Sequence, residues 1–314
     1  EDETVYRKIA ETLKQRNIGA FFYIGGNDSM DTVNKLSEYF RTTDLDTKMI
    51  GIPKTIDNDL AVTDHTPGFG SAAKYVATTM REITRDSTVY SIPSVTIVEI
   101  MGRHAGWLTA SSAVLHAMGE TAPHLVYVPE VKFSAESFLR DVKQEMSKHK
   151  AVIVAVSEGI EVPDGVQSGV VDNFGHKYLS GIGKYLEGLV RSEVGCKVRS
   201  VEISLLQRCA SHIASACDIE ESQRIGEAAV RHGVVGETGK MMTFRRVKNA
   251  DKYTVEVFSE DLSEIANRTR KVPAAFIGED GTSITEKCLD YMLPLIQGEA
   301  KSVYEDGVPV HFAF

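Results

Sequence analysis

The chain alternates short apolar runs, rich in β-branched residues, with longer segments whose apolar residues recur every three or four positions. The helical spacing is clear at Val5, Ile9 and Leu13, and again between Val33 and Phe40. Continuous apolar strands separated by helices are typical of a parallel sheet covered on both faces. The pattern therefore predicts an α/β fold, with strands at residues 20–24, 49–52, 95–100, 125–128 and 151–156.

Size and charge argue against some kinds of protein. A chain of 314 residues is long enough for one large domain or two ordinary ones. No apolar run approaches the roughly 20 residues that cross a membrane. The net charge is −9 and no block of basic residues is present, which argues against a nucleic-acid partner. Four cysteines without CxxC spacing indicate reduced thiols, so we expect a cytoplasmic protein.

Each predicted strand ends in a polar or glycine-rich turn. In open α/β sheets, ligands bind outside the carboxyl ends of the strands, so turns far apart in the sequence can line one crevice. These turns are residues 25–28, 53–59, 101–103, 129–130 and 157–159. They are the first place to look for functional residues.

The first turn carries Gly25 and Gly26, followed by Asn27 and Asp28. Two glycines after a strand allow a tight turn and close approach of a ligand, and the next helix would point its free N–H groups at an anion. A structural turn capped by Asn or Asp is the alternative interpretation.

The second turn places two carboxylates two residues apart, Asp57 and Asp59, after Lys54. Residues two apart share a face of an extended segment, so both carboxylates could project into one site. Phosphoryl transfer needs a base for the attacking hydroxyl, oxygen ligands for Mg²⁺ and cations that offset phosphoryl charge. The alternative is a solvated acidic turn that caps the next helix.

Further candidates are arginines and a carboxylate. Arg103 follows the strand at 95–100 and could bind phosphate through two hydrogen bonds, although a surface ion pair is the commoner role. Glu158, Arg199 and Arg208 would suit a sugar phosphate. No P-loop and no GxSxG motif is present, and the histidines show no metal-binding spacing.

Taken together, these turns resemble the signature of the phosphofructokinase family. The matching segments occur in the family's order, and the resemblance runs from about residue 18 to about residue 246. They are residues 25–29, 53–59, 66–70, 98–103, 128–130 and 207–208, of which PKTIDND and VEIMGR are the most specific.

The resemblance implies a fold and an assembly. It implies two three-layer α/β/α domains with mainly parallel sheets and the active site in the cleft between them. Residues 1–69 with about 208–265 would bind the phosphoryl donor, and residues 70–207 with about 266–314 would bind the sugar phosphate. It also implies Mg²⁺ as cofactor and a homo-oligomer, dimer or tetramer, with no nucleic-acid or membrane partner.

The resemblance also implies a reaction, the transfer of a phosphoryl group to the 1-hydroxyl of fructose 6-phosphate in glycolysis. The implied roles fall on residues that match the family's motifs. Asp57 matches the general base, with Lys54 and Arg103 as catalytic cations and Asp59 and Asn27 near the metal; Thr55, Ile56, Met101, Gly102, Glu158, Arg199 and Arg208 match substrate-binding positions, and Gly25 and Gly26 the phosphate loop. Arg199 or Arg208 typically comes from a neighbouring subunit.

The phosphoryl donor depends on two side chains. ATP-using members have glycine where this chain has Asp28, whose carboxylate fills the space of a nucleotide phosphate. Lys54 would stabilise the phosphate that leaves pyrophosphate. The pair resembles the branch of the family that uses pyrophosphate reversibly. The alternatives are an ATP-dependent enzyme, a non-catalytic relative of the family, and a small-molecule-binding protein on an α/β scaffold.

Four departures from the family pattern stand out. Asn27 stands where the family usually has an aspartate that helps to hold Mg²⁺. Leu205 and Ser94 stand where bacterial ATP-using members have, respectively, a histidine that touches the sugar phosphate and an intersubunit arginine. Family members also have a longer segment before the Gly25 turn, with a first strand and a phosphate loop. We therefore expect this sequence to be part of a longer chain.

Overall fold

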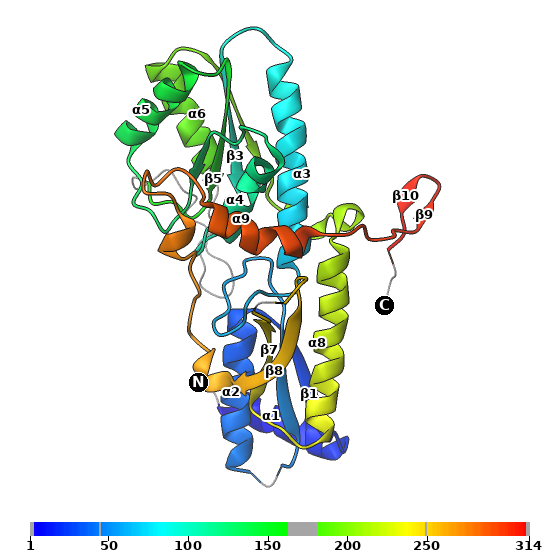
Figure 1. Cartoon of the computed structure of the whole chain (residues 1–314). Coiled ribbons are helices and arrows are strands. Elements are labelled where there is room, and N and C mark those ends of the chain that lie inside the picture. Colours follow the sequence, from blue (N-terminus) through cyan, green and yellow to red (C-terminus); the bar gives the residue numbers. More distant parts are fainter. Residues whose placement is uncertain (1–2, 44, 163–180, 249, 312–314) are drawn as a thin grey trace. The chain divides into compact units, whose positions relative to one another are not determined.

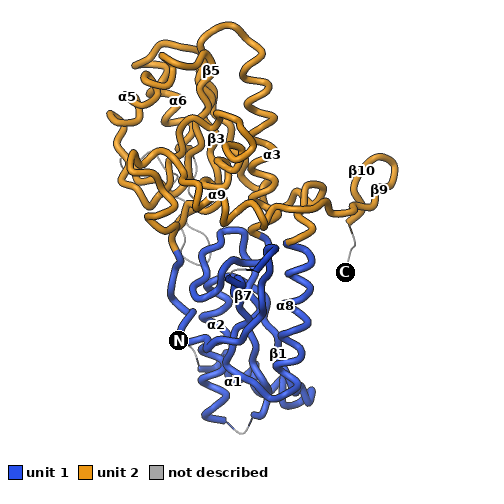
Figure 2. The backbone as a smooth tube through the Cα atoms, in the orientation of Figure 1, with its two compact units in different colours: residues 1–68, 218–270 blue, residues 69–217, 271–314 orange. Residues whose placement is uncertain are grey.

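The computed structural model describes residues 3–43, 45–162, 181–248 and 250–311. The chain forms two compact units, each built from two segments (Figure 2). Unit 1 comprises Glu1–Gly68 and Asp218–Arg270, and unit 2 comprises Phe69–Cys217 and Lys271–Phe314.

The boundaries differ from the expected ones at two segments. Residues 208–217 belong to unit 2, where Ser215 donates its hydroxyl to the backbone oxygen of Leu295 at 2.7 Å. Residues 266–270 belong to unit 1, because the Arg270 guanidinium binds backbone oxygens of that unit, including Asn58 O at 2.8 Å. Both shifts reflect hydrogen bonds between residues far apart in the sequence.

Unit 1 is a sheet covered on both faces. Its elements are α1 (Glu3–Gln15), β1 (Ala20–Gly25), α2 (Asn27–Arg41), β2 (Lys48–Pro53), most of α8 (Ala216–Val234), β7 (Lys240–Arg246), β8 (Val255–Asp261) and η3 (Leu262–Glu264). The strand order is β1-β2-β7-β8, parallel except for the antiparallel pair β7 and β8.

The two faces of this sheet bury different side chains, as the period of two in a strand requires. Met49 and Met241 face the layer of α1 and α2, where they pack in one cluster with Leu13, Val33 and Phe40. The neighbouring residues on each strand point the other way. Ile50 and Met242 pack with residues of α8, namely Ile225, Ala228 and Ala229.

Unit 2 contains a second sheet, of order β4-β5-β3-β6 and parallel throughout. Figure 1 labels its strands β3 and β5. Its elements are α3 (Phe69–Thr88), β3 (Ser94–Ile100), α4 (Trp107–Ser111), η1 (Ser112–Met118), β4 (Leu125–Tyr127), α5 (Ala135–Met146), β5 (Ala151–Ser157), α6 (Ile182–Glu193), β6 (Lys197–Glu202), α7 (Leu206–Cys209), η2 (Ser211–Ile213), η4 (Ala274–Phe276), α9 (Glu286–Met292), η5 (Leu293–Ile296), β9 (Tyr304–Glu305) and β10 (Val308–Pro309).

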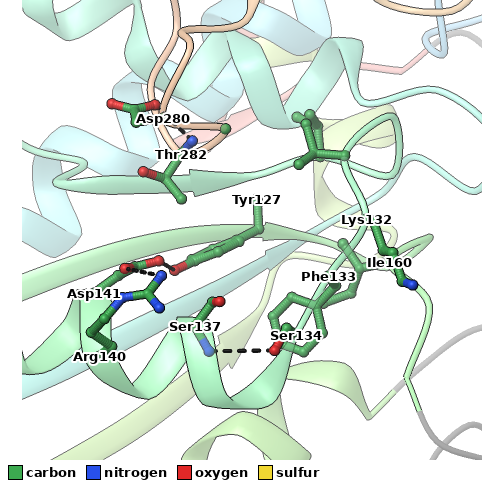
Figure 3. A pocket seen from close by; sticks show the side chains of 13 residues that line it. Tyr127, Lys132, Phe133, Ser134, Ser137, Arg140, Asp141, Ile160, Asp280 and Thr282 are labelled. Carbon is green, nitrogen blue, oxygen red and sulfur yellow. Dashed lines mark hydrogen bonds and ion pairs between the residues drawn. The ribbon is translucent and has the colours of Figure 1, made fainter.

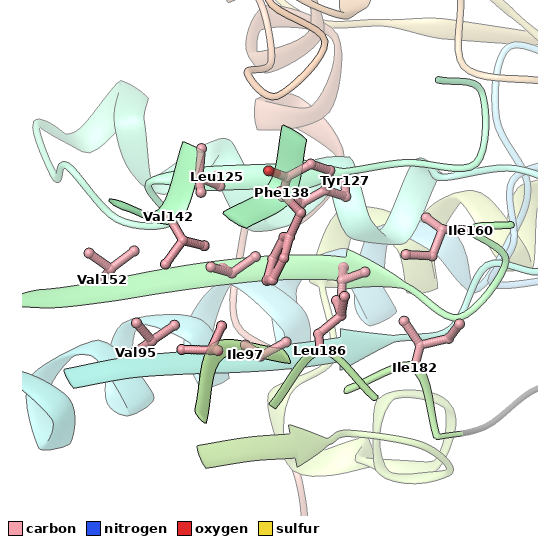
Figure 4. Close-up of a cluster of buried hydrophobic side chains, with 13 residues drawn as sticks. Val95, Ile97, Leu125, Tyr127, Phe138, Val142, Val152, Ile160, Ile182 and Leu186 are labelled. Carbon is pink, nitrogen blue, oxygen red and sulfur yellow. The ribbon is translucent and has the colours of Figure 1, made fainter. Parts of the chain in front are cut away.

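One core cluster of unit 2 lies between its sheet and helices α5 and α6 (Figure 4). Phe138 and Val142 of α5 and Leu186 of α6 meet Ile97 of β3 and Val154 of β5. Every residue of β5 is buried, as expected for a central parallel strand covered on both faces.

The α/β prediction is confirmed, and each of the five predicted strands is present within a residue or two. The apolar pattern did not reveal β6, β7 or β8, nor the two-residue strands β9 and β10. Strands β6 and β8 lie at sheet edges and carry many exposed or half-buried residues, whereas β7 is an inner strand with four buried residues. Within the described part of the chain, no helix is both long enough and apolar enough to cross a membrane.

Candidate active site

The first two predicted turns lie side by side at the carboxyl edge of the unit 1 sheet. Strands β1 and β2 pair in parallel, with Gly25 opposite Pro53 at their ends. The pairing continues one residue further, because Lys54 N donates to Gly25 O at 2.9 Å. The glycine turn and the Lys54 turn therefore share one end of the sheet.

Helix α2 begins at Asn27, directly after the two glycines, and Gly26 caps it without a side-chain hydrogen bond. The first N–H groups of an α-helix have no intrahelical partner, so this turn presents donors beside the sheet edge. Gly25 is required by space: a Cβ there would lie 2.0 Å from Ser29 Oγ. Asp28 lies in the first turn of the helix and its side chain is exposed.

The second turn brings its two carboxylates together with Asn27. Asn27 Nδ2 donates to Asp59 Oδ2 at 2.8 Å, and Thr55 Oγ1 donates to Asp57 Oδ2 at 3.2 Å. Burial, and then the neighbouring charge of Asp57, raise the pKa of Asp59 to about 6. The predicted cluster of Asp57 and Asp59 is thus present.

The backbone conformation that brings these two carboxylates together is not the predicted one. Residues 55–59 form a bend rather than an extended strand, with a turn at Ile56 and Asp57 and a left-handed Asn58 at φ 54°. The bend is fixed by the buried Asn58, whose Oδ1 accepts from Thr66 N at 3.1 Å. Thr66 in turn donates its hydroxyl to Thr55 O at 2.7 Å.

A buried histidine lies at the far end of this loop. His65 Nδ1 is 2.9 Å from Asp64 Oδ1 and Nε2 is 2.6 Å from Glu221 Oε2, while the ring stacks on Phe244 with centroids 4.7 Å apart. Burial opposes the charged ring, but the hydrogen bonds to the two carboxylates outweigh it and raise the pKa of His65. This ion-paired group joins the loop to helix α8 and strand β7.

In unit 2, the turn after β3 is built on close backbone contacts. Gly102 has φ 150° and its N–H donates to Glu158 Oε1 at 3.2 Å. Ser157 donates its hydroxyl to Gly102 O at 2.6 Å. A Cβ on Gly159 would lie 2.2 Å from Arg103 O, so this position admits only glycine without movement of the turn.

The predicted residues of unit 2 do not all gather at this edge. Met101, Gly102 and Arg103 follow β3, Glu158 follows β5, and Arg208 lies in α7 just after β6, exposed. The Nε of Arg103 is buried and has no hydrogen-bond partner among the described residues.

Arg199 is the exception. It lies within β6 opposite Thr96, four residues before the end of β3, or about 13 Å along the strand. Its guanidinium pairs with Asp86 at 3.2 Å. Within this chain the structure therefore does not bring Arg199 to the Gly102 turn.

Three supporting residues were not predicted as site residues. Glu130 accepts from Gly106 N at 3.0 Å and Val272 N at 2.9 Å, and so braces the segment after Arg103. Glu99 accepts from Gly183 N at 2.7 Å, and burial raises its pKa to about 6. The only sequence signal for Glu99 was a carboxylate within an apolar run. The third supporting residue is Arg270, described below, for which the sequence carried no signal.

A separate pocket of about 150 Å³ lies in unit 2 beside the start of α5 (Figure 3). Tyr127 donates its hydroxyl to Asp141 Oδ2 at 3.1 Å, and Arg140 lies 3.3 Å from the other oxygen of Asp141. Burial, and then the charge of Asp141, raise the pKa of Tyr127. None of the predicted site residues lines this pocket.

The residues beside Asp59 fit a hard cation. Asn27 Oδ1 is buried and accepts no hydrogen bond from any described residue, while the other half of the amide holds Asp59. Carboxylate and amide oxygens are the ligands that Mg²⁺ takes in proteins. No group of three or more His, Cys, Asp and Glu residues suited to a metal occurs in the described ranges, so Asn27 and substrate oxygens would complete the set.

Comparison with known proteins agrees with this arrangement of turns. The family model described as Phosphofructokinase matches residues 1–232. The chain belongs to the phosphofructokinase family. The curated pyrophosphate–fructose 6-phosphate 1-phosphotransferase of Halomonas elongata is 38% identical over 311 residues, which cover 98% of this chain and 74% of that protein. The protein of the same name from Xanthomonas campestris pv. campestris is 39% identical over 316 residues, with coverage of 98% and 75%.

A solved phosphofructokinase has the same fold. The crystal structure of the pyrophosphate-dependent phosphofructokinase from Nitrosospira multiformis matches with a TM-score of 0.87 and 36% identity, over 98% of this chain and 75% of that one. Leu205 of this chain is 56% exposed.

Proposed function

We propose that this phosphofructokinase transfers a phosphoryl group reversibly between pyrophosphate and the 1-hydroxyl of fructose 6-phosphate. The oxygen of the 1-hydroxyl forms a bond to the terminal phosphorus of pyrophosphate, the bridging P–O bond breaks, and phosphate leaves. The hydroxyl proton passes to a carboxylate. The products are fructose 1,6-bisphosphate and phosphate, and the reaction serves glycolysis or gluconeogenesis according to the direction of flux.

One observation carries this proposal: Asp57 lies beside Asp59 at the end of β2, and Asp59 is held by an amide whose oxygen faces no described donor. Asp57 is placed as the general base, with Thr55 Oγ1 orienting its carboxylate at 3.2 Å. Asp59 and Asn27 would hold Mg²⁺, which supplies positive charge to the phosphoryl oxygens. In this assignment Asp57, and not Asp59, accepts the proton of the 1-hydroxyl.

The remaining residues bind and neutralise the substrates. We assign Lys54, Gly25 and Gly26 of unit 1 to pyrophosphate, because they share one sheet end with the open N-terminus of α2. Arg103 of unit 2 has a buried Nε without a described partner and is suited to a phosphoryl oxygen. Glu158, which also accepts from Gly102 N, is assigned to sugar hydroxyls.

Arg208 and Arg199 are assigned to the 6-phosphate. Because Arg199 lies opposite a residue about 13 Å before the end of β3, we assign it to the site of a neighbouring copy in a homo-oligomer. We place the enzyme in the cytoplasm, with unit 1 as the donor domain and unit 2 as the sugar-phosphate domain.

Pyrophosphate is favoured over ATP by the exposed carboxylate of Asp28 in the first turn of α2. A carboxylate there repels a further phosphate of a nucleotide and occupies its space. The relatives that match over nearly the whole chain carry names that specify pyrophosphate, which supports the same choice. The presence of Asp57, Asp59 and Arg103 argues against a non-catalytic relative.

Replacement of the base tests the proposal. We expect Asp57→Asn to lower kcat by about 10²–10⁴-fold with fructose 6-phosphate and pyrophosphate, because the proton loses its acceptor. Asp31→Asn is the matched control, since Asp31 lies in α2 and pairs with Lys35 at 2.8 Å. Full activity in a folded Asp57→Asn variant would refute the assignment.

A further inference from the structure

Arg270, at the end of unit 1, binds the loop that carries Asp57 and Asp59. Its Nη2 donates to Asn58 O at 2.8 Å and its Nε to the same oxygen at 3.2 Å. Its Nη1 donates to Thr63 O at 3.0 Å and also to Asp64 O. Its backbone N–H donates to Asp59 O at 2.7 Å. One residue thus bonds to four carbonyl oxygens of the segment 58–64.

This segment has an unfavourable backbone. Asn58 and Val62 both have positive φ, at 54° and 69°. A β-branched residue such as Val62 is an outlier in the left-handed region, and such conformations persist only when surrounding contacts hold them. Contacts that hold this arch include the guanidinium of Arg270, the Asn58 side chain and the bridge between Leu60 and Thr269. Phe244 of β7 also holds its far end, because Phe244 N donates to Thr63 Oγ1 at 2.9 Å and Asp64 N donates to Phe244 O at 2.8 Å.

The chemistry of arginine suits this task. Its planar guanidinium has five N–H donors in a fixed fork, whereas a lysine ammonium is a point charge on a flexible stem. Only the fork can bond at once to the carbonyls of Asn58 and Thr63, at the two ends of the arch. Asn58 stands between Asp57 and Asp59, so displacement of its carbonyl moves both carboxylates.

We propose that Arg270 is a positioning residue that holds the strained arch at 58–64 and thereby sets the geometry of Asp57 and Asp59. This role rests on the proposed phosphoryl transfer, but the holding of the arch can be measured without it. Arg270 is not placed against a substrate.

The test compares Arg270→Gln, Arg270→Lys and a matched control. Arg245→Gln is the control. Arg245 and Arg270 both line a cavity of about 830 Å³ in unit 1, but Arg245 pairs with Glu260 of β8 at 3.2 Å. For each protein we would measure kcat and KM with fructose 6-phosphate and pyrophosphate, and amide hydrogen exchange of peptides that cover residues 57–66.

We expect Arg270→Gln to lower kcat by about 10²-fold, since misplacement of a catalytic group by about 1 Å costs that much. The KM for fructose 6-phosphate should change less than about threefold, and amide exchange over 57–66 should rise. Arg270→Lys should fall between Arg270→Gln and the wild type, and Arg245→Gln should match the wild type. If Arg270→Gln does not fold, Arg270→Lys carries the test.

Two results would overturn the inference. Unchanged exchange over 57–66 would show that Arg270 does not hold the arch, and raised exchange with unchanged kcat would show that the arch does not position the carboxylates. A full-length wild-type protein without turnover would refute the proposed function instead. Exchange alone would then decide whether Arg270 holds the arch.

Discussion

The two turns that carry the proposed chemistry are held in different ways. In unit 1, the loop at 55–66 is held by side chains, several of them charged, through Arg270, Asn58 and His65. In unit 2, the turn at 101–103 packs closely against Gly159, which leaves no room for a Cβ beside Arg103 O, and the side chains of Ser157 and Glu158 hydrogen-bond to Gly102. The first turn should therefore respond to changes of charge and pH, and the second to changes of side-chain volume.

The largest effect on stability should come from the buried ion pair of unit 1. His65→Gln leaves the buried Glu221 without its cation, and we expect the free energy of unfolding to fall by about 3–5 kcal/mol. The measurement is chemical denaturation, compared with Arg245→Gln. A loss below about 1 kcal/mol would contradict this description of unit 1.

The same variant should show a defined pH dependence. The pKa of His65 is raised above its ordinary value of 6.5, so its contribution to stability is complete below pH 6.5 and is lost as pH rises through the folded pKa. The difference in unfolding free energy between wild type and His65→Gln should therefore shrink as pH rises. A difference that grows with pH would contradict a charged His65.

The corresponding change in unit 2 is one of volume. Gly159→Ala adds a Cβ that would lie 2.2 Å from Arg103 O and 2.4 Å from Gly102 O, so the turn must move. We expect a loss of about 1–3 kcal/mol in the free energy of unfolding and a fall of about 10²-fold in kcat/KM.

A second glycine of unit 2 provides the control for Gly159→Ala. Gly188 lies inside α6 with no atom within 4 Å of a built Cβ. Gly188→Ala should stabilise the protein by about 0.5–1 kcal/mol through helix propensity and leave kcat/KM unchanged. Equal effects of the two alanines would show that close packing at Gly159 is not what holds the turn.

The sequence predicts much of this arrangement because its strongest patterns are local. Apolar runs predict β1 to β5 but not the inner strand β7, and the turn motifs predict which strand ends carry Asp57, Gly102 and Glu158. The bend at Asn58 was not predicted, since it depends on a hydrogen bond from Thr66, eight residues away.

Longer-range contacts were harder still to foresee. Arg270 binds carbonyls more than 200 residues away in the sequence, and no spacing rule connects them. Its place outside any helix or strand gives it no periodic pattern, so the unit boundary near 270 was also misplaced. The exposed position of Arg199 in the middle of β6 likewise could not be predicted, because it depends on the register of β3 and β6.

The smallest expected effect concerns the choice of donor within unit 1. Asp28→Gly removes the carboxylate proposed to exclude a nucleotide, and we expect the ratio of kcat/KM for ATP to that for pyrophosphate to rise about tenfold. Adding Lys54→Gly should raise this ratio further by weakening the use of pyrophosphate. Asp31→Asn, three residues along the same helix, should leave it unchanged. An unaltered ratio in Asp28→Gly would remove the steric and electrostatic explanation.

The most direct test of the central claim is a comparison of donors with the wild-type protein. Formation of fructose 1,6-bisphosphate from fructose 6-phosphate and Mg²⁺ would be measured with pyrophosphate and, separately, with ATP. We predict turnover with pyrophosphate and a kcat/KM for ATP at least about 10²-fold lower. Turnover with ATP and none with pyrophosphate would contradict the account.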